Sequence, residues 1–302
     1  MKVKTKALLL ILIIYVFADI FLIASVMLLK DAIKSPILVM FIADIVATLF
    51  VYLTSLVFKN ASVYDPYWSV VPVFIIITYY IFYDVTFYAY HLIVLIPFLI
   101  WAIRLTLNWV IGFEDLNWED FRYKGFKEKY PKLYQFISLI GIMLIPTCLV
   151  FLGTIPLWFL ISSDSFSFTF IIGGAIILFA VIYQAISDYQ MKKFKNEENA
   201  KSCIDTGLWR YSRHPNYFGE ICIWWGCAIS AIGVYGIASD LSLSVWLYFI
   251  LAFAGAVFIT LLFIFISIPM MEKHIIITKD GYLDYKKKVK SPLFPICRKK
   301  DN

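Results

Sequence analysis

The sequence predicts an all-α fold, a polytopic membrane bundle of about eight transmembrane helices, because both its composition and its pattern are those of a membrane protein. Apolar residues make up 62% of the 302 residues and charged residues 16%, whereas soluble domains contain about 45–50% and 25%. The mean hydropathy is +0.81. The apolar residues form long continuous runs, whereas the strands of transmembrane barrels alternate apolar and polar residues. A soluble globule, a disordered chain and a disulfide-stapled secreted module are therefore excluded.

Apolar runs of the length that crosses a hydrocarbon core of about 30 Å recur along the whole chain. The third run is shorter than the others, so seven spans is the alternative to eight. The first run follows Lys2, Lys4 and Lys6 as in a signal peptide, but its length and the lack of a small-residue cleavage site indicate a retained anchor. The runs are 7–29, 36–58, 70–83, 86–112, 135–162, 167–187, 217–238 and 243–270.

The distribution of basic residues tests this topology. With eight spans, 24 of the 27 lysines and arginines lie on the side of the N-terminus; the opposite side has only Lys30 and Lys34, and Arg104 lies within a span. The positive-inside rule therefore predicts that both termini are cytosolic. The net charge of +6 is explained by this topology, so we expect no nucleic-acid partner.

The ends of the chain and the cysteines give two further expectations. Lys299 and Lys300 resemble the dilysine signal by which coat proteins return membrane proteins to the endoplasmic reticulum; a generic basic tail is the alternative. No CxxC spacing occurs among the five cysteines, and the three histidines are far apart, so we expect no metal.

Polar residues gather at the cytosolic ends of the predicted spans. The segment 64–69 (YDPYWS) has the aromatic residues of an interfacial belt, which is its simplest interpretation. Arg104 lies inside the fourth run and shares a helix face with Trp101 and Asn108. An arginine within a membrane span indicates a functional site, and snorkelling to the headgroups is the alternative. The charged residues of 114–122 are interpreted mostly as a solvated loop.

A second group of polar residues lies in the C-terminal half. A helical stripe at the end of the sixth span contains Gln184, Asp188, Lys192 and Lys195. Pro215 suits the first turn of the seventh span, and two arginines just before such a helix start suit a phosphate. Buried carboxylates need partners, so a ligand amide or ring is expected at Glu220. The arginines are Arg210 and Arg213, and the stripe that enters the membrane is Asn216, Glu220, Trp224 and Cys227.

The run GLWRYSRHPNYFGE (207–220) resembles the C-terminal half of the steroid 5-alpha-reductase family, closest to a branch that also carries YDPYWS and RLTxNW. RHPNY is also similar to isoprenylcysteine carboxyl methyltransferases. Ser-Asp-Tyr at 187–189 and Asp284-Tyr285 before a proline favour the reductases. The resemblance covers about 60–295, which divides the chain into an N-terminal transmembrane pair, 1–59, and a reductase-like membrane domain with a cytosolic tail, 60–302.

The resemblance implies NADPH in a cavity that opens to the cytosol. Lys195 replaces an arginine of the family, and His274 falls near a tail position that closes over the cofactor. Asp65 stands in the segment that polarises the substrate ketone; the family's tyrosine acid falls near Trp101, so Tyr64 or Tyr67 is the substitute. The implied cofactor contacts are Arg104, Asn108, Gln184, Asp188, Lys195, Arg210, Arg213, His214, Asn216, Glu220 and His274.

The expected function is NADPH-dependent saturation of a carbon–carbon double bond conjugated to a carbonyl, with hydride delivered to the beta carbon. The expected substrate is lipophilic and enters from the membrane lipids: a sterol, a polyprenal or an enoyl lipid. The alternative is an S-adenosylmethionine-dependent methyltransferase acting on an isoprenylcysteine or a lipid. A third interpretation is a lipid-binding protein without catalysis, which the tryptophan at position 101 permits.

Overall fold

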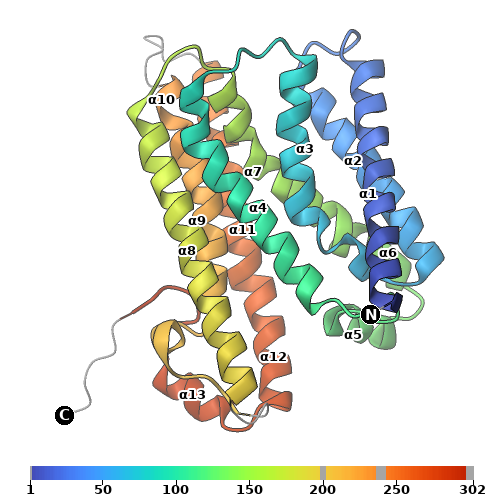
Figure 1. The fold of residues 1–302 in the computed structure, drawn as a ribbon, viewed down its shortest axis with the longest axis vertical. Coiled ribbons are helices and arrows are strands. Elements are labelled where there is room, and N and C mark those ends of the chain that lie inside the picture. Colours follow the sequence, from blue (N-terminus) through green and yellow to red (C-terminus); the bar gives the residue numbers. More distant parts are fainter. Residues whose placement is uncertain (1, 198–201, 236–242, 297–302) are drawn as a thin grey trace.

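The computed structural model describes residues 2–197, 202–235 and 243–296, which form a bundle of long helices and contain no strand (Figure 1). Eight helical segments within these residues are long and apolar enough to cross a membrane, which confirms the all-α membrane fold and the count of eight. The dilysine signal predicted at Lys299 and Lys300 lies outside the described residues.

Three of the eight spans are single long helices, α1, α2 and α8, and the other five combine consecutive helical segments. The long helices are α1 (Lys2–Leu29), α2 (Pro36–Phe58), α3 (Tyr67–Phe82), α4 (Leu92–Gly112), α7 (Ile145–Ile161), α8 (Phe168–Glu197), α9 (Pro215–Ser230) and α11 (Leu243–Leu262). The shorter segments are η1 (Ala61–Tyr64), η2 (Ala89–His91), α5 (Phe121–Lys129), α6 (Tyr134–Phe136), η3 (Ile137–Leu144), η4 (Gly207–Arg210), α10 (Ile232–Tyr235), η5 (Phe263–Ser267), α12 (Ile268–Thr278) and α13 (Tyr282–Lys288).

The third span is longer than its apolar run. Tyr67, Trp68 and Ser69, which the hydropathy pattern leaves outside the run, form the first turn of α3. Together with η1 they extend the segment to Ala61–Phe82, which is long enough to span. A hydropathy count misses the start of this span, because its side chains are polar. They are buried against protein and not against lipid.

Close helix packing depends on glycines at two crossings. A Cβ atom on Gly226 of α9 would lie 3.0 Å from the carbonyl oxygen of Gly173 of α8, and one on Gly255 of α11 would lie 2.2 Å from the backbone nitrogen of Gly153 of α7. Small residues let membrane helices approach closely enough for backbone contact. The pairs α8–α9 and α7–α11 therefore form the C-terminal half of the bundle. In the N-terminal half, α2 packs on α1, α7, η1 and η3.

The loop after α4 is held under the third span by Asn60. Lys59 ends α2 in the left-handed conformation (φ 52°), and the next side chain, Asn60, caps η1. The Asn60 amide also donates to the carbonyl oxygens of Leu116 (2.8 Å) and Trp118 (2.7 Å). These bonds bring α5, which follows in sequence, beneath η1 and α3.

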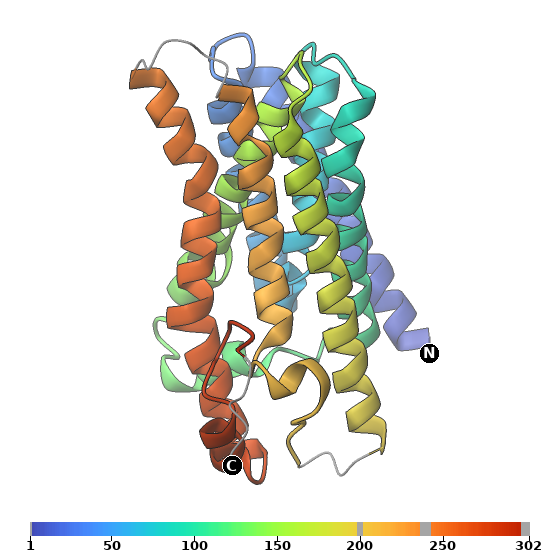
Figure 2. The same cartoon turned by 90° about the vertical axis from the view of Figure 1, so that its left-hand side faces the viewer.

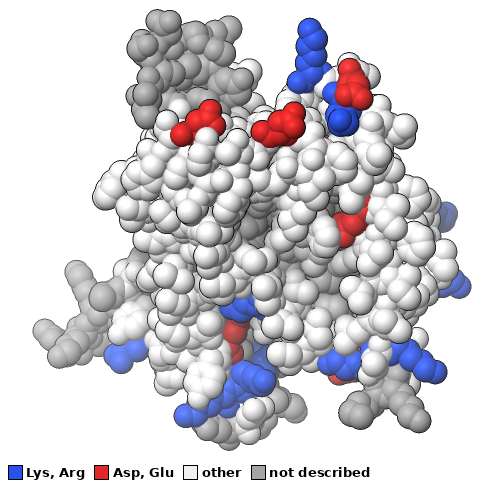
Figure 3. Space-filling model, turned by 45° about the horizontal axis from the view of Figure 1, so that its top comes forward, with Lys and Arg blue, Asp and Glu red and all other residues white. Residues whose placement is uncertain are grey.

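One end of the bundle carries the basic residues. The start of α1, α5 and α13 all lie at this end (Figures 1 and 2). In Figure 3 the blue side chains gather mainly toward the lower edge, and the middle of this face is almost entirely white. The distribution follows the pattern that the positive-inside rule predicts for the face at which the chain begins.

We expect Gly255→Val to destabilise the bundle, because the new side chain would meet the α7 backbone at Gly153. Overpacking of this kind costs about 1–3 kcal/mol. Thermal unfolding in detergent measures the effect. Gly112→Val is the matched control, since nothing lies within 4 Å of a Cβ there; an equal loss in both variants would contradict the close approach.

Candidate active site

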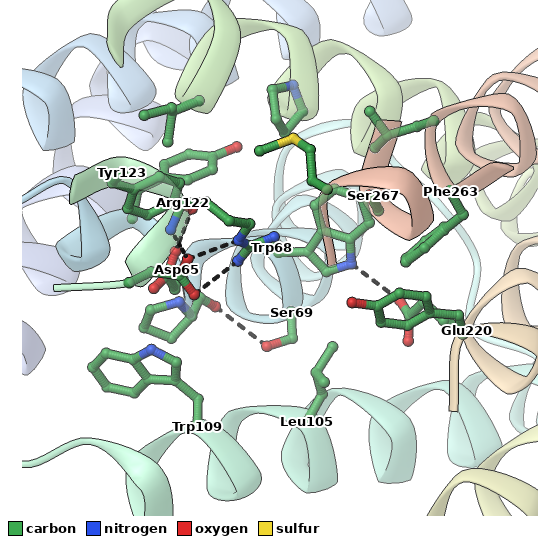
Figure 4. A pocket seen from close by; sticks show the side chains of 18 of the residues that line it. Asp65, Trp68, Ser69, Leu105, Trp109, Arg122, Tyr123, Glu220, Phe263 and Ser267 are labelled. Atoms are coloured by element: carbon green, nitrogen blue, oxygen red, sulfur yellow. Dashed lines mark hydrogen bonds and ion pairs between the residues drawn. The ribbon is translucent and has the colours of Figure 1, made fainter. Parts of the chain in front are cut away.

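A cavity of about 640 Å³ lies in the half of the bundle that carries most of the basic residues (Figure 1). This volume falls in the range of about 300–1,000 Å³ that is typical of small-molecule sites. Its walls come from α3, α4, α5, α8 and α9, and from η3 and η5 with the helices that follow them. Figure 4 shows Asp65 and Tyr123 at one end of the cavity and Glu220 at the other.

The Glu220 carboxylate is buried and accepts hydrogen bonds from four side chains. Oε1 accepts the indole N–H groups of Trp68 (3.0 Å) and Trp224 (3.3 Å). Oε2 accepts the indole N–H of Trp101 (2.9 Å) and the amide of Gln184 (2.8 Å). The donors come from α3, α4, α8 and α9. Because every acceptor direction of a carboxylate is used, Glu220 is fully satisfied by the protein.

Two glycines make room for this arrangement. A Cβ on Gly153 would lie 2.4 Å from the Trp224 ring, so the absent side chain provides the space for that indole. A Cβ on Gly219 would lie 2.3 Å from Gln184, so α9 approaches the amide that Glu220 needs. The local sequence of α7 and α9 thus permits the four helices to converge on one carboxylate.

An ion pair continues the network toward the basic end. Arg104 of α4 donates to Asp188 (2.7 Å) and to Gln184 (2.5 Å) of α8. Asn108, one turn further along α4, also donates to Asp188 (3.0 Å). The Gln184 amide therefore links the Arg104 cation to the Glu220 anion. The stripes expected on α4, α8 and α9 are brought together, and snorkelling of Arg104 to the headgroups is not what the structure shows.

Three buried polar atoms in the cavity wall have no hydrogen-bond partner within the described residues. They are the donors Arg104 Nε and Trp109 Nε1 and the acceptor Asn216 Oδ1. Buried polar groups are normally paired, so unpaired ones in a cavity indicate a polar ligand. Two donors and an acceptor complement a primary carboxamide, which carries one carbonyl oxygen and two N–H groups. The nicotinamide end of NADPH carries this group.

Asp65 forms a carboxyl–phenol pair on the opposite wall. The Tyr123 hydroxyl of α5 donates to Asp65 Oδ1 at 2.7 Å (Figure 4). Burial, followed by the negative charge of Asp65, raises the pKa of Tyr123 well above its usual value of 10, so the phenol keeps its proton. Next to it, Arg122 forms a bidentate ion pair with Asp120 (2.8 and 3.1 Å). A proton is therefore held in hydrogen-bonding position at the cavity wall.

The two tyrosines expected as acids differ in position. Tyr64 lines the cavity, and its hydroxyl hydrogen-bonds to Thr147 at 2.7 Å. Tyr67 instead donates to Asp44 of α2 at 3.0 Å and is buried between helices outside the cavity wall. The α3 helix starts at Tyr67, so this side chain and that of Trp68 point to different faces. We therefore leave Tyr67 out of the candidate site.

Arg213 and His214 anchor the C-terminal segment. Arg213 donates to Glu272 (2.7 Å) and to the carbonyl oxygens of Val289 and Lys290 (both 2.7 Å). His214 Nε2 lies 3.5 Å from Glu272, and burial lowers the pKa of this histidine. The expected phosphate contact of Arg213 is corrected by this geometry, because its guanidinium is buried among protein acceptors and does not line the cavity.

The remaining expected contacts lie near the same end of the bundle but outside the cavity wall. Lys195 and Arg210 are exposed. The His274 ring of α12 stacks on Phe121 of α5 with 3.8 Å between ring centroids. This contact joins α12 to the helix that carries Tyr123. His274 thus lies at the edge of the site, where it can position α5.

Tyr123, Trp68 and Glu119 are parts of the site region that the sequence analysis missed. The interpretation of 114–122 as a solvated loop is wrong in part, because Glu119 is buried and accepts from the Ala61 amide, Tyr134 and Lys127. The sequence signal for Tyr123 was weak, since α5 has no apolar stripe. Trp68 was within a noted motif, but its indole was assigned to an interfacial belt.

The fold and the cavity define a polytopic helical membrane protein with an internal cavity of the size that small-molecule sites have. The family model described as "Protein of unknown function (DUF1295)" matches residues 51–289, and the chain belongs to this family. No curated protein and no solved structure gives a significant match. The matched range contains all the cavity-lining residues named above.

We expect Glu220→Gln to destabilise the protein. An amide offers one acceptor oxygen, and its NH₂ group would face two of the four donors, so the loss is about 2–4 kcal/mol. Thermal unfolding in detergent, followed by tryptophan fluorescence, measures it. Glu114→Gln, at an exposed glutamate, is the control. A Glu220→Gln protein as stable as wild type would show that the carboxylate is a tolerated charge.

We expect Arg213→Ala to release the C-terminal segment. The substitution removes three hydrogen bonds and leaves Glu272 with Lys286 as its main cation, at a cost of about 3–5 kcal/mol. Limited trypsin digestion should then cleave faster at residues 286–290. Arg210→Ala is the matched control because that arginine is exposed. Equal digestion rates in the two variants would contradict the anchoring role.

Proposed function

We propose that this protein is a membrane oxidoreductase that uses NADPH to saturate a double bond conjugated to a carbonyl in a lipid-like substrate. The proposal is carried by three buried atoms without a hydrogen-bond partner among the described residues, Arg104 Nε, Trp109 Nε1 and Asn216 Oδ1. They line the same cavity as the Asp65–Tyr123 pair. The three unpaired atoms complement a nicotinamide carboxamide, and the Tyr123 hydroxyl of the pair can donate to a carbonyl. The resemblance of 207–220 to steroid 5-alpha-reductases supports the same chemistry.

The residues that would hold the nucleotide lie on α4, α8 and α9. Arg104, Asn108, Asp188 and Asn216 face one side of the cavity and form a polar surface for the nicotinamide half. The exposed cations at this end of the bundle, such as Lys195 and Arg210, are available to the phosphates. Glu220 is not a direct contact in this proposal; it fixes the positions of Trp101 and Gln184, and through Gln184 that of Arg104.

When bound, NADPH supplies the hydride that adds to the beta carbon. The Tyr123 hydroxyl, which donates to Asp65 in the free protein, would turn its one proton to the substrate carbonyl and so stabilise the negative charge that develops on the carbonyl oxygen. The alpha carbon takes a proton that comes from the cytosol, so each turnover consumes one NADPH and one proton. By the positive-inside rule we place the site on the cytosolic side, and the dilysine tail supports location in the endoplasmic reticulum.

The identity of the nucleotide tests the proposal directly. Protein purified in detergent should bind NADPH, and binding should weaken as salt rises because phosphates are held by charged groups. S-adenosylmethionine bound in place of NADPH would select methyl transfer, and the binding of neither would leave a lipid-binding protein. NADH bound as tightly as NADPH would show that Lys195 and Arg210 do not contact the 2′-phosphate.

We expect Tyr123→Phe to lower kcat for enone reduction about 10²-fold while the Kd of NADPH stays unchanged. The variant keeps the ring but removes the proton beside Asp65. NADPH oxidation, followed by its absorbance, measures the rate. Tyr130→Phe is the matched control, since Tyr130 follows α5 directly and is exposed. Equal kcat in both variants would remove the Asp65–Tyr123 pair from the mechanism.

A further inference from the structure

Two π-helical segments face the cavity from different spans. Segment η3 precedes α7 and contributes Ile137 and Gly141 to the wall; segment η5 follows α11 and contributes Phe263 and Ile266. Figure 4 shows Phe263 and Ser267 on the side opposite Leu105 and Trp109. π-helical turns are rare and are frequent at functional sites. Two π-helical segments on one cavity wall therefore indicate that this wall has a function.

The helices next to these segments, α7 and α11, pack closely at a crossing that lies outside the cavity wall. Helices α7 and α11 are in backbone contact at Gly153 and Gly255. Among the described residues, the close neighbours of η3 are α2, α6, α7 and η1, whereas those of η5 are α11 and α12. The two π-helical segments are therefore not closely packed against each other.

Three residues that line the cavity at or next to these segments are apolar and exposed. Ile145 at the start of α7 is 46% exposed, and Ile266 of η5 is 51% exposed, yet both line the cavity. Gly141 of η3 also lines it and is exposed. All three lie within membrane spans. The cavity wall is thus continuous with the lipid-facing surface between η3 and η5.

The capacity of the cavity limits what can be enclosed. A volume of about 640 Å³ suits one ligand of drug size, and in the proposed function part of it is taken by the nicotinamide half of the nucleotide. The cavity is too small to enclose a second ligand of that size together with the nicotinamide half. Only the reactive end of a large lipid can then lie inside, and the rest must leave through an apolar opening.

We propose that the substrate is a lipid with one long flexible chain, acyl or isoprenoid, whose conjugated carbonyl lies at Asp65–Tyr123 and whose chain passes between η3 and η5 into the bilayer. This inference rests on the proposed function and narrows its substrate class. The chain contacts Ile145, Phe263 and Ile266. A rigid sterol held entirely within the cavity is the outcome that would contradict it.

Narrowing the opening tests the path of the chain. Ile266→Trp adds bulk at the opening, and Gly141→Phe does so where the nearest atom to a new Cβ is an Ile137 methyl at 3.9 Å. We expect each variant to raise KM for a long-chain 2-enal about tenfold while KM for its short water-soluble homologue stays unchanged. Phe265→Trp is the matched control, because Phe265 is exposed on η5 and does not line the cavity.

A photoreactive long-chain 2-enal with a diazirine on its tail gives a second readout that needs no turnover. Cross-links in the wild-type protein, mapped by mass spectrometry, should fall within 137–145 or 262–270. Cross-links on α1, α2 or α4 instead would overturn the inference, and so would equal KM changes for both enals or faster turnover of a sterol enone. Wild-type protein that oxidises NADPH with none of these carbonyl compounds would overturn the proposed function itself.

Discussion

The buried carboxylate of Glu220 is the constraint on which the site depends. Within a membrane bundle this group needs several hydrogen-bond donors, and it obtains them from four helices at once. Three indoles and one amide hold it, so α3, α4, α8 and α9 have a fixed relation to one another. Gln184, which donates to Glu220, also accepts from Arg104 and so connects the two side chains. Loss of this contact would disturb each wall of the cavity that these helices form.

A second ionic centre closes the basic end. Glu272 of α12 pairs with Arg213 and Lys286, while the Arg213 guanidinium also binds the backbone of the last described segment. These bonds join the loop before α9 to the segment after α12. His274, two residues from Glu272, stacks on Phe121 of α5. The C-terminal segment is therefore coupled through α12 to the helix that carries Tyr123.

Two parts of the cavity wall differ in polarity, as the proposed reaction between a polar nucleotide and a lipid requires. The donors and acceptors at Arg104 and Asn216 suit a polar ring; the Arg104 side chain is held by Asp188, and the Asn216 backbone carbonyl accepts from Gln184. The wall between η3 and η5 contains apolar residues that face lipid. The close contact of α7 with α11 lies at Gly153 and Gly255, displaced along these helices from the residues of the opening.

The sequence alone predicted seven or eight spans, the basic end and the stripes of α4, α8 and α9, because hydropathy and helical periodicity are local properties. It could not determine which side chains meet across helices. Arg213 was expected at a phosphate and lies on Glu272; Tyr67 was expected in the site and lies on Asp44; Tyr123 came from a segment without an apolar pattern. Only tertiary packing decides these pairings, since a buried polar group takes the partner that neighbouring helices bring within about 3 Å.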